Sequence, residues 1–171
     1  MISIAALICT SLVSFAAQPA ASCMNVTSTG TAALNGFLVN GVPVFGAPPQ
    51  PAMLGNLPVM VSSFITGQTL SGSNGQGATH LTLQHTYEST DPARPGKFIT
   101  EDRAVCAPSG SDPTVCRVND VLRIVSGDGI FTNATGSLRN HGLIFFAPTA
   151  QYPGGHLTYD VRGRVCGSGP F

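Results

Sequence analysis

Residues 79 to 87 read Thr-His-Leu-Thr-Leu-Gln-His-Thr-Tyr, an alternation of apolar and polar side chains. One face of this segment carries Leu81, Leu83, His85 and Tyr87. Because successive side chains of a β-strand point to opposite faces, the alternation predicts a half-buried strand. Residues 157 to 165 repeat the pattern near the end of the chain, and their apolar face carries Leu157, Tyr159, Val161 and Val165.

Weaker strand patterns occupy most of the region between and before these two segments. They are rich in Val, Ile, Phe and Thr and are separated by Gly, Pro, Asn and Ser, at residues 37–45, 57–66, 98–105, 121–126, 135–138 and 141–147. No segment after residue 22 has the 3.6-residue period of an amphipathic helix. The fold class predicted is all-β, a small antiparallel barrel of about eight strands that forms one domain over residues 23–171.

The first 22 residues have the character of a signal peptide. An uncharged apolar run covers residues 2–17, and Ala20 and Ser22 offer small side chains for cleavage before Cys23. No Lys or Arg precedes the run, which is unusual for such a leader. We expect a secreted or periplasmic protein without a membrane span, and acylation of Cys23 to give a lipid anchor is the alternative.

Cleavage removes Cys9 and leaves an even set of cysteines, which fits two disulfides in an oxidising compartment. Cys23 begins the mature chain and Cys166 lies near its end, so their bond would tie the first segment to the last strand. Cys106 and Cys116 flank a hairpin-like loop. We expect these two pairs; the other pairings would tie the ends of the chain into the middle of the sheet and remain open.

The charge of the chain is balanced, with 8 basic and 8 acidic residues, and none of them precedes Glu88. This composition gives no basic surplus for nucleic acid, which we exclude as a partner. Asn25 and Asn133 lie in glycosylation sequons that have meaning only in a eukaryotic secretory pathway.

Residues 41–58 contain five prolines together with apolar Phe45, Met53 and Leu54. We expect an extended strap over one end of the barrel, either as a packed crossover or as a lid. If the barrel holds a small molecule, its interior should contain an apolar cavity of about 300 Å³ or more near this strap.

A glycine-rich segment follows the strand predicted at 121–126 and reads Ser126-Gly-Asp-Gly-Ile-Phe-Thr-Asn-Ala-Thr-Gly136. Gly127 and Gly129 permit positive φ and a tight bend, Phe131 is expected to enter the core, and Gly136 keeps the returning backbone close. A phosphate-binding loop is disfavoured because no helix and no Lys-Ser/Thr pair follow.

This segment resembles the Gly-x-Gly-x-Phe-x-x-Ala-x-Gly signature of dirigent proteins and allene oxide cyclases, with Asp128 where a small hydroxyl residue is usual. Residues 138–144 and 159–166 are similar to strands of exported barrels of the same kind. The resemblance implies an eight-stranded barrel. Dirigent proteins steer the coupling of phenoxy radicals and the cyclases fold an unstable epoxide, and neither family's pocket residues can be placed on this chain.

Four residues are candidates for contacts with a ligand. His85 and Tyr87 share the apolar face of their strand, where His85 is either a core group or an acid/base group. Glu101 and Arg103 share a face with Ile99, so this pair is expected either inside the barrel or as a surface ion pair. No metal site is expected, because His80 and His85 lie on opposite faces and no cysteine or carboxylate has a supporting spacing.

These observations predict an exported barrel, without cofactor, that binds a small apolar or phenolic molecule or has a structural role. The alternative is an enzyme, a cofactor-free cyclase or isomerase or a dirigent-like protein that folds a reactive substrate into shape. A serine hydrolase is disfavoured because no Gly-x-Ser-x-Gly elbow occurs. The sequence leaves the ligand, the catalytic residues and the oligomeric state undetermined.

Overall fold

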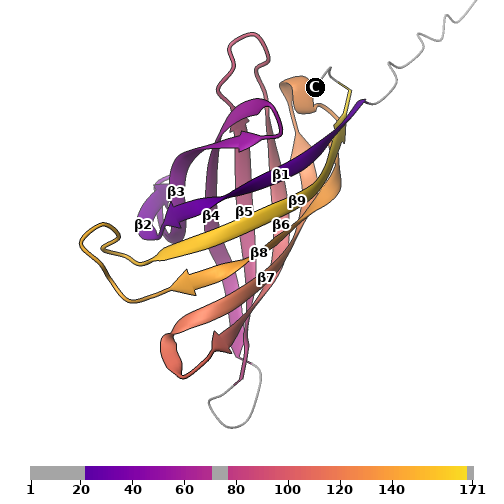
Figure 1. Cartoon of the computed structure of the whole chain (residues 1–171). Coiled ribbons are helices and arrows are strands. Elements are labelled where there is room, and N and C mark those ends of the chain that lie inside the picture. Colours follow the sequence, from indigo (N-terminus) through magenta and orange to yellow (C-terminus); the bar gives the residue numbers. More distant parts are fainter. Residues whose placement is uncertain (1–21, 71–76, 169–171) are drawn as a thin grey trace, which may run out of the picture.

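The computed structural model describes residues 22–70 and 77–168, so the predicted leader lies outside the described residues. The described chain forms one antiparallel sheet of nine strands in the order β1-β9-β8-β7-β6-β5-β4-β3-β2 (Figure 1). The elements are β1 (Ser22–Ala33), β2 (Asn35–Val39), β3 (Val42–Leu54), β4 (Leu57–Leu70), β5 (Thr79–Ser89), β6 (Lys97–Ser109), β7 (Asp112–Gly127), the 3₁₀ turn η1 (Gly129–Phe131), β8 (Thr135–Phe145) and β9 (His156–Gly167). The all-β class is therefore confirmed, with nine strands where about eight were predicted.

The sheet curls into a barrel (Figure 1). β1 and β3 lie against each other where the barrel closes, but no backbone ladder joins them. One side chain bridges this seam. The amide oxygen of Gln50 on β3 accepts a hydrogen bond from the Ala33 N–H at 3.1 Å, and its Nε2 donates to the Ala33 carbonyl at 3.3 Å. Gln50 thus gives β1 the donor and acceptor that a neighbouring backbone would supply.

Several strand boundaries differ from those predicted. Residues 135–138 and 141–147, predicted as two strands, belong largely to one strand, β8. The first strand, β1, was not predicted. Residues 37–45 form a hairpin of β2 and β3, because Asn40 and Gly41 both adopt positive φ, 50° and 79°, and reverse the chain.

The predicted strap at 41–58 is a strand, and neither a lid nor a crossover, since most of it is β3. Its prolines fit because the pairing with β4 is interrupted between Ala47 and Gln50, where Pro48 and Pro49 form a bulge that needs no donor. The apolar side chains divide between the two faces: Leu54 is buried at 2% exposure, whereas Met53 is 49% exposed.

The interior is packed at both ends of the barrel. Phe98, Leu122, Phe131 and Leu138 are fully buried in the larger cluster, which also contains Val26, Leu57 and Val165. A smaller cluster of Leu81, Ala104, Val118, Cys106 and Cys116 lies elsewhere along the same strands. The space between the clusters is available for a site.

Both predicted disulfides are present. Cys23 pairs with Cys166 directly opposite on β1 and β9, and Cys106 pairs with Cys116 between β6 and β7. Such bonds are typical of an oxidising, extracytoplasmic compartment. Among the residues that the structure describes, no helix has the length and apolar character needed to cross a membrane.

The glycine-rich segment forms the predicted bend with one difference. Gly129 has φ +56° and packs against the backbone at Pro95, and Phe131 is buried with its ring edge-on to Phe98 at 4.9 Å. The φ of Gly127 lies outside the left-handed region; this position needs glycine because a Cβ would meet the Phe131 carbonyl oxygen. The turn therefore places the aromatic side chain of Phe131 in one end of the core.

Candidate functional site

A cavity of about 300 Å³ lies inside the barrel, between the packed clusters. The strand that was predicted as a strap contributes one wall, from Ala47 to Leu54. Most of the lining is apolar, including Val59, Leu81, Leu83, Ala104, Val118 and Ile144. The polar lining includes Gln50, Ser63, His85, Asp120, Asn140 and Tyr159. The cavity expected for a small-molecule barrel is thus present.

Five buried or half-buried polar side chains form a continuous band on neighbouring strands, which we call the polar wall: Ser63 on β4, His85 on β5, Asp102 on β6, Asp120 on β7 and Asn140 on β8. Ser63 stands directly opposite His85, and Asp120 stands directly opposite Asn140. Facing residues on neighbouring strands have Cβ atoms about 5 Å apart, so these side chains are neighbours.

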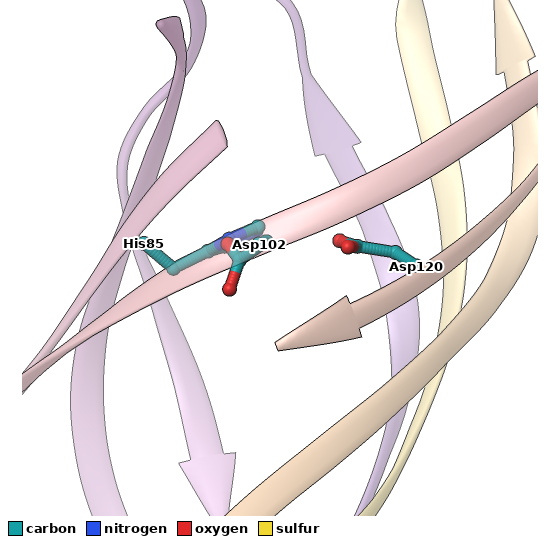
Figure 2. Close-up of side chains that lie close together, drawn as sticks. All are labelled: His85, Asp102 and Asp120. Atoms are coloured by element: carbon teal, nitrogen blue, oxygen red, sulfur yellow. The ribbon is translucent and has the colours of Figure 1, made fainter. Parts of the chain in front are cut away.

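His85 and Asp102 form the closest contact of the wall, 2.5 Å between imidazole Nδ1 and carboxylate Oδ2. The Asp102 side chain is fully buried and that of His85 is 14% exposed. An ionised carboxylate can only accept, so Nδ1 donates in this bond and Nε2 is left for other partners. Figure 2 shows His85 and Asp102 together, with the Asp120 carboxylate directed toward them. The pair orients the imidazole as an acid/base group requires.

Asp120 is 4% exposed, and its pKa is raised from 3.8 to about 6. The main cause is burial, which disfavours the charged carboxylate, and the negative charge of Asp102 adds to it. The positive charge that His85 carries when protonated acts in the opposite direction. Asp120 therefore changes its protonation near neutral pH.

Several buried oxygens of this region have no hydrogen-bond partner in the described chain. They are Oγ1 of Thr100 and one Oδ1 atom each of Asp102, Asp120 and Asn140. Buried polar atoms are normally satisfied, because an unmade hydrogen bond in the interior costs about 1 to 3 kcal/mol. Two of these residues, Asp120 and Asn140, line the cavity. Unpartnered acceptors at that place are what a binding site for a donor-bearing molecule requires.

Tyr87 contributes an aromatic edge to the cavity. Its ring stacks on Phe98 with centroids 4.6 Å apart and lies 6.1 Å from the His85 ring. Burial and the nearby carboxylates raise the pKa of Tyr87, so its hydroxyl stays protonated. His85 and Tyr87 thus both lie at the cavity, on the strand face predicted from their alternation.

The interior placement considered for Glu101 and Arg103 is wrong. Both side chains are exposed on the outside of β6, and Asp102 between them points inward. The orientation of β6 is set by Phe98 and Cys106, which are buried and lie on the same face of the strand as Asp102. Ile99 lies on the outer face of β6, so its apolar side chain did not mark the inner face of the strand.

Sequence reasoning also missed that two carboxylates meet His85. One ligand atom from each of His85, Asp102 and Asp120 lies within 4.8 Å of the others, a group of the kind that can hold a metal ion. The placement of His80 and His85 on opposite faces, with no carboxylate at a supporting spacing, had argued against a metal site, but the carboxylates beside His85 come from β6 and β7. One pattern pointed to Asp120, which alternates with the buried apolar residues Val118, Leu122 and Ile124.

Comparison of the chain with protein-family models, with curated proteins and with solved structures gives no match. The cavity and the polar wall are therefore the features of the molecule that point to a function.

Proposed function

We propose that the protein is an exported barrel that binds a small, mainly apolar molecule in its cavity. The observation that carries the proposal is the combination of an apolar lining with a few converging polar groups around about 300 Å³ of space. Ligand sites in proteins have this composition, and their volumes begin near this value, which favours a compact ligand such as a single-ring compound.

Export to the periplasm or the outside of the cell forms part of the proposal. The two disulfides support it, since such bonds persist in oxidising compartments. The leader-like composition of residues 1–22 supports it independently.

A second candidate function is that of a cofactor-free isomerase or cyclase. The His85–Asp102 pair favours it, because an oriented imidazole beside a carboxyl group that titrates near pH 6 can exchange protons with a bound molecule. The resemblance of residues 126–136 to dirigent proteins and allene oxide cyclases is in keeping with a barrel that folds a reactive substrate.

A thermal-shift screen of the oxidised protein with apolar and phenolic compounds tests the binding function. We expect some single-ring compounds to raise the melting temperature. Leu83→Trp should abolish the shift because the indole would fill the cavity that Leu83 lines. Val121→Trp is the control, since Val121 is 50% exposed on the outer face of β7. Failure of every compound would contradict the proposal and leave a structural role.

The two candidate functions are distinguished by the fate of a bound compound. Each compound that raises the melting temperature is incubated with the protein and then analysed by NMR. Rearranged product that forms with the parent, and is lost in His85→Gln while binding persists, would establish the enzyme. Recovery of unchanged compound in every case would leave the binding module.

A further inference from the structure

The polar wall offers acceptors and negative charge to the cavity. Asp120 and Asn140 line the cavity side by side, and each has a buried oxygen without a partner in the described chain. Their exposed fractions, 4% and 7%, place both side chains almost entirely in the interior. A molecule that satisfies these oxygens must bring hydrogen-bond donors.

The charges of the interior do not balance. Two carboxylates, Asp102 and Asp120, face one imidazole, so one negative charge remains when both are ionised, even with a doubly protonated His85. All eight Lys and Arg residues lie in the described ranges, and none of them lines the cavity. Buried charges are normally paired, because desolvation of an unpaired ion is costly.

We propose that the natural ligand carries a protonated amine, which lies against Asp120 and Asn140 while its apolar body occupies the rest of the cavity. This inference rests on the proposed binding function and names the chemical class of its ligand. An ammonium group supplies up to three donors and one positive charge, which matches both the unpartnered acceptors and the excess negative charge.

Two other occupants match the wall less well. A neutral alcohol has one donor and leaves the charge uncompensated. A metal ion would use His85, Asp102 and Asp120, but Nδ1 of His85 is already bonded to Asp102, and the apolar lining of the cavity would then have no role. An amine on an apolar body uses both parts of the cavity.

Protonation of Asp120 gives the binding a pH dependence. Because the pKa of Asp120 is raised to about 6, its carboxylate is mainly ionised above that pH and neutral below it. The other titratable side chains facing it are His85 and Tyr87 from β5, Asp102 from β6 and Tyr159 from β9. Protonation of Asp120 removes its negative charge and therefore weakens amine binding as the pH falls.

The test uses four probes of similar shape: benzylamine, benzyl alcohol, benzyl methyl ether and benzoate. Calorimetry at pH 7.5 should show benzylamine binding at least about tenfold tighter than benzyl alcohol, since hydrogen bonds between charged groups are stronger than those of a neutral hydroxyl. Benzyl methyl ether, which brings no donor, should bind more weakly than the alcohol, and benzoate should not bind. At pH 5 the preference for the amine should shrink severalfold, a result that needs no variant.

Asp120→Asn removes the charge with little change of shape, so this variant should bind the amine no better than the alcohol. Glu101→Gln is the matched control, because it removes a carboxylate from the exposed outer face of β6 and should leave the preference intact.

Four results would overturn the inference. Equal affinity for amine and alcohol, or an amine preference that survives in Asp120→Asn, would remove the role of the charge. Stabilisation by Zn²⁺ or Mn²⁺ alone, lost in both His85→Gln and Asp120→Asn, would assign the wall to a metal. Binding of neutral compounds without binding of the amine would contradict this inference and leave the proposed function standing. Failure of all probes and screened compounds would contradict the proposed function itself.

Discussion

His85 donates to Asp102 diagonally across β5 and β6, since His85 stands opposite Thr100 and Asp102 stands opposite Leu83 in the ladder. The bond therefore uses the twist of the sheet, which brings diagonal neighbours within reach of long side chains. It joins a fully buried carboxylate to the partner that gives it a charge-assisted hydrogen bond.

Removal of the imidazole should leave Asp102 buried without this partner. We expect His85→Leu to lower the free energy of unfolding by about 3 to 5 kcal/mol, as is typical when one member of a buried pair is lost. The double variant His85→Leu/Asp102→Leu should regain most of the loss, because no uncompensated charge remains. Urea denaturation of the parent, the double variant and the two single variants His85→Leu and Asp102→Leu measures the coupling, and additive losses would show that the two side chains do not depend on each other.

Asp120 should make stability depend on pH. Its pKa is raised from 3.8 to about 6 in the folded protein, so the folded state holds the proton more tightly than the unfolded chain does. This contribution is complete below about pH 4 and is lost as the pH rises through 6. Relative to Asp120→Asn, the parent should lose about 2 to 3 kcal/mol of unfolding free energy over that range. Parallel pH profiles of the two proteins would contradict the shift.

The seam of the barrel should depend on Gln50. Gln50→Leu removes both hydrogen bonds to Ala33, so we expect a loss of about 1 to 3 kcal/mol and faster hydrogen exchange at the Ala33 amide. Gln68→Leu, at an exposed position on β4, is the control. Unchanged protection of Ala33 in Gln50→Leu would mean that the seam is held by packing alone.

The two disulfides should contribute unequally. In the chain-entropy model, a bond across 143 residues stabilises by about 5 kcal/mol and one across 10 residues by about 3 kcal/mol. Replacement of the Cys23 and Cys166 pair by serine should therefore cost more than replacement of Cys106 and Cys116. Non-reducing peptide mapping of the parent checks the pairing first, and a free thiol or a lipid on Cys23 would exclude it.

Gly129 should tolerate no side chain. Gly129→Val forces a β-branched residue to positive φ and drives its Cβ into the Pro95 carbonyl oxygen, so we expect a loss of about 3 kcal/mol or more. Gly110→Val is the control, because Gly110 has φ +72° with no atom within 4 Å of a new Cβ. It should show only the backbone strain. Equal melting temperatures of the two variants would remove the role assigned to the close approach at Gly129.

Much of the fold follows from patterns within single segments. The alternation in residues 79–87 and 157–165 predicts which side chains face inward, and the structure places Leu81, Tyr87, Tyr159 and Val161 at the cavity. Phe131 enters the core as the glycines around it predict. These results are local, because the side chains of a strand alternate whatever its neighbours are.

The polar wall was decided by the tertiary structure. Alternation assigns residues to two faces, but it does not say which face is inside when both carry apolar and charged residues. On β6 the burial of Phe98 and Cys106 decides which face is inside. Asp102 therefore points inward, whereas Glu101 and Arg103 are exposed. The meeting of His85, Asp102 and Asp120 depends further on the register of three strands, which hairpins and bulges fix and no single segment encodes. The sequence by itself determined the class of fold and the inner face of the clearest strands, and it favoured two cysteine pairs. The tertiary structure decided that pairing, and the site arose from side chains that become neighbours only when the sheet curls.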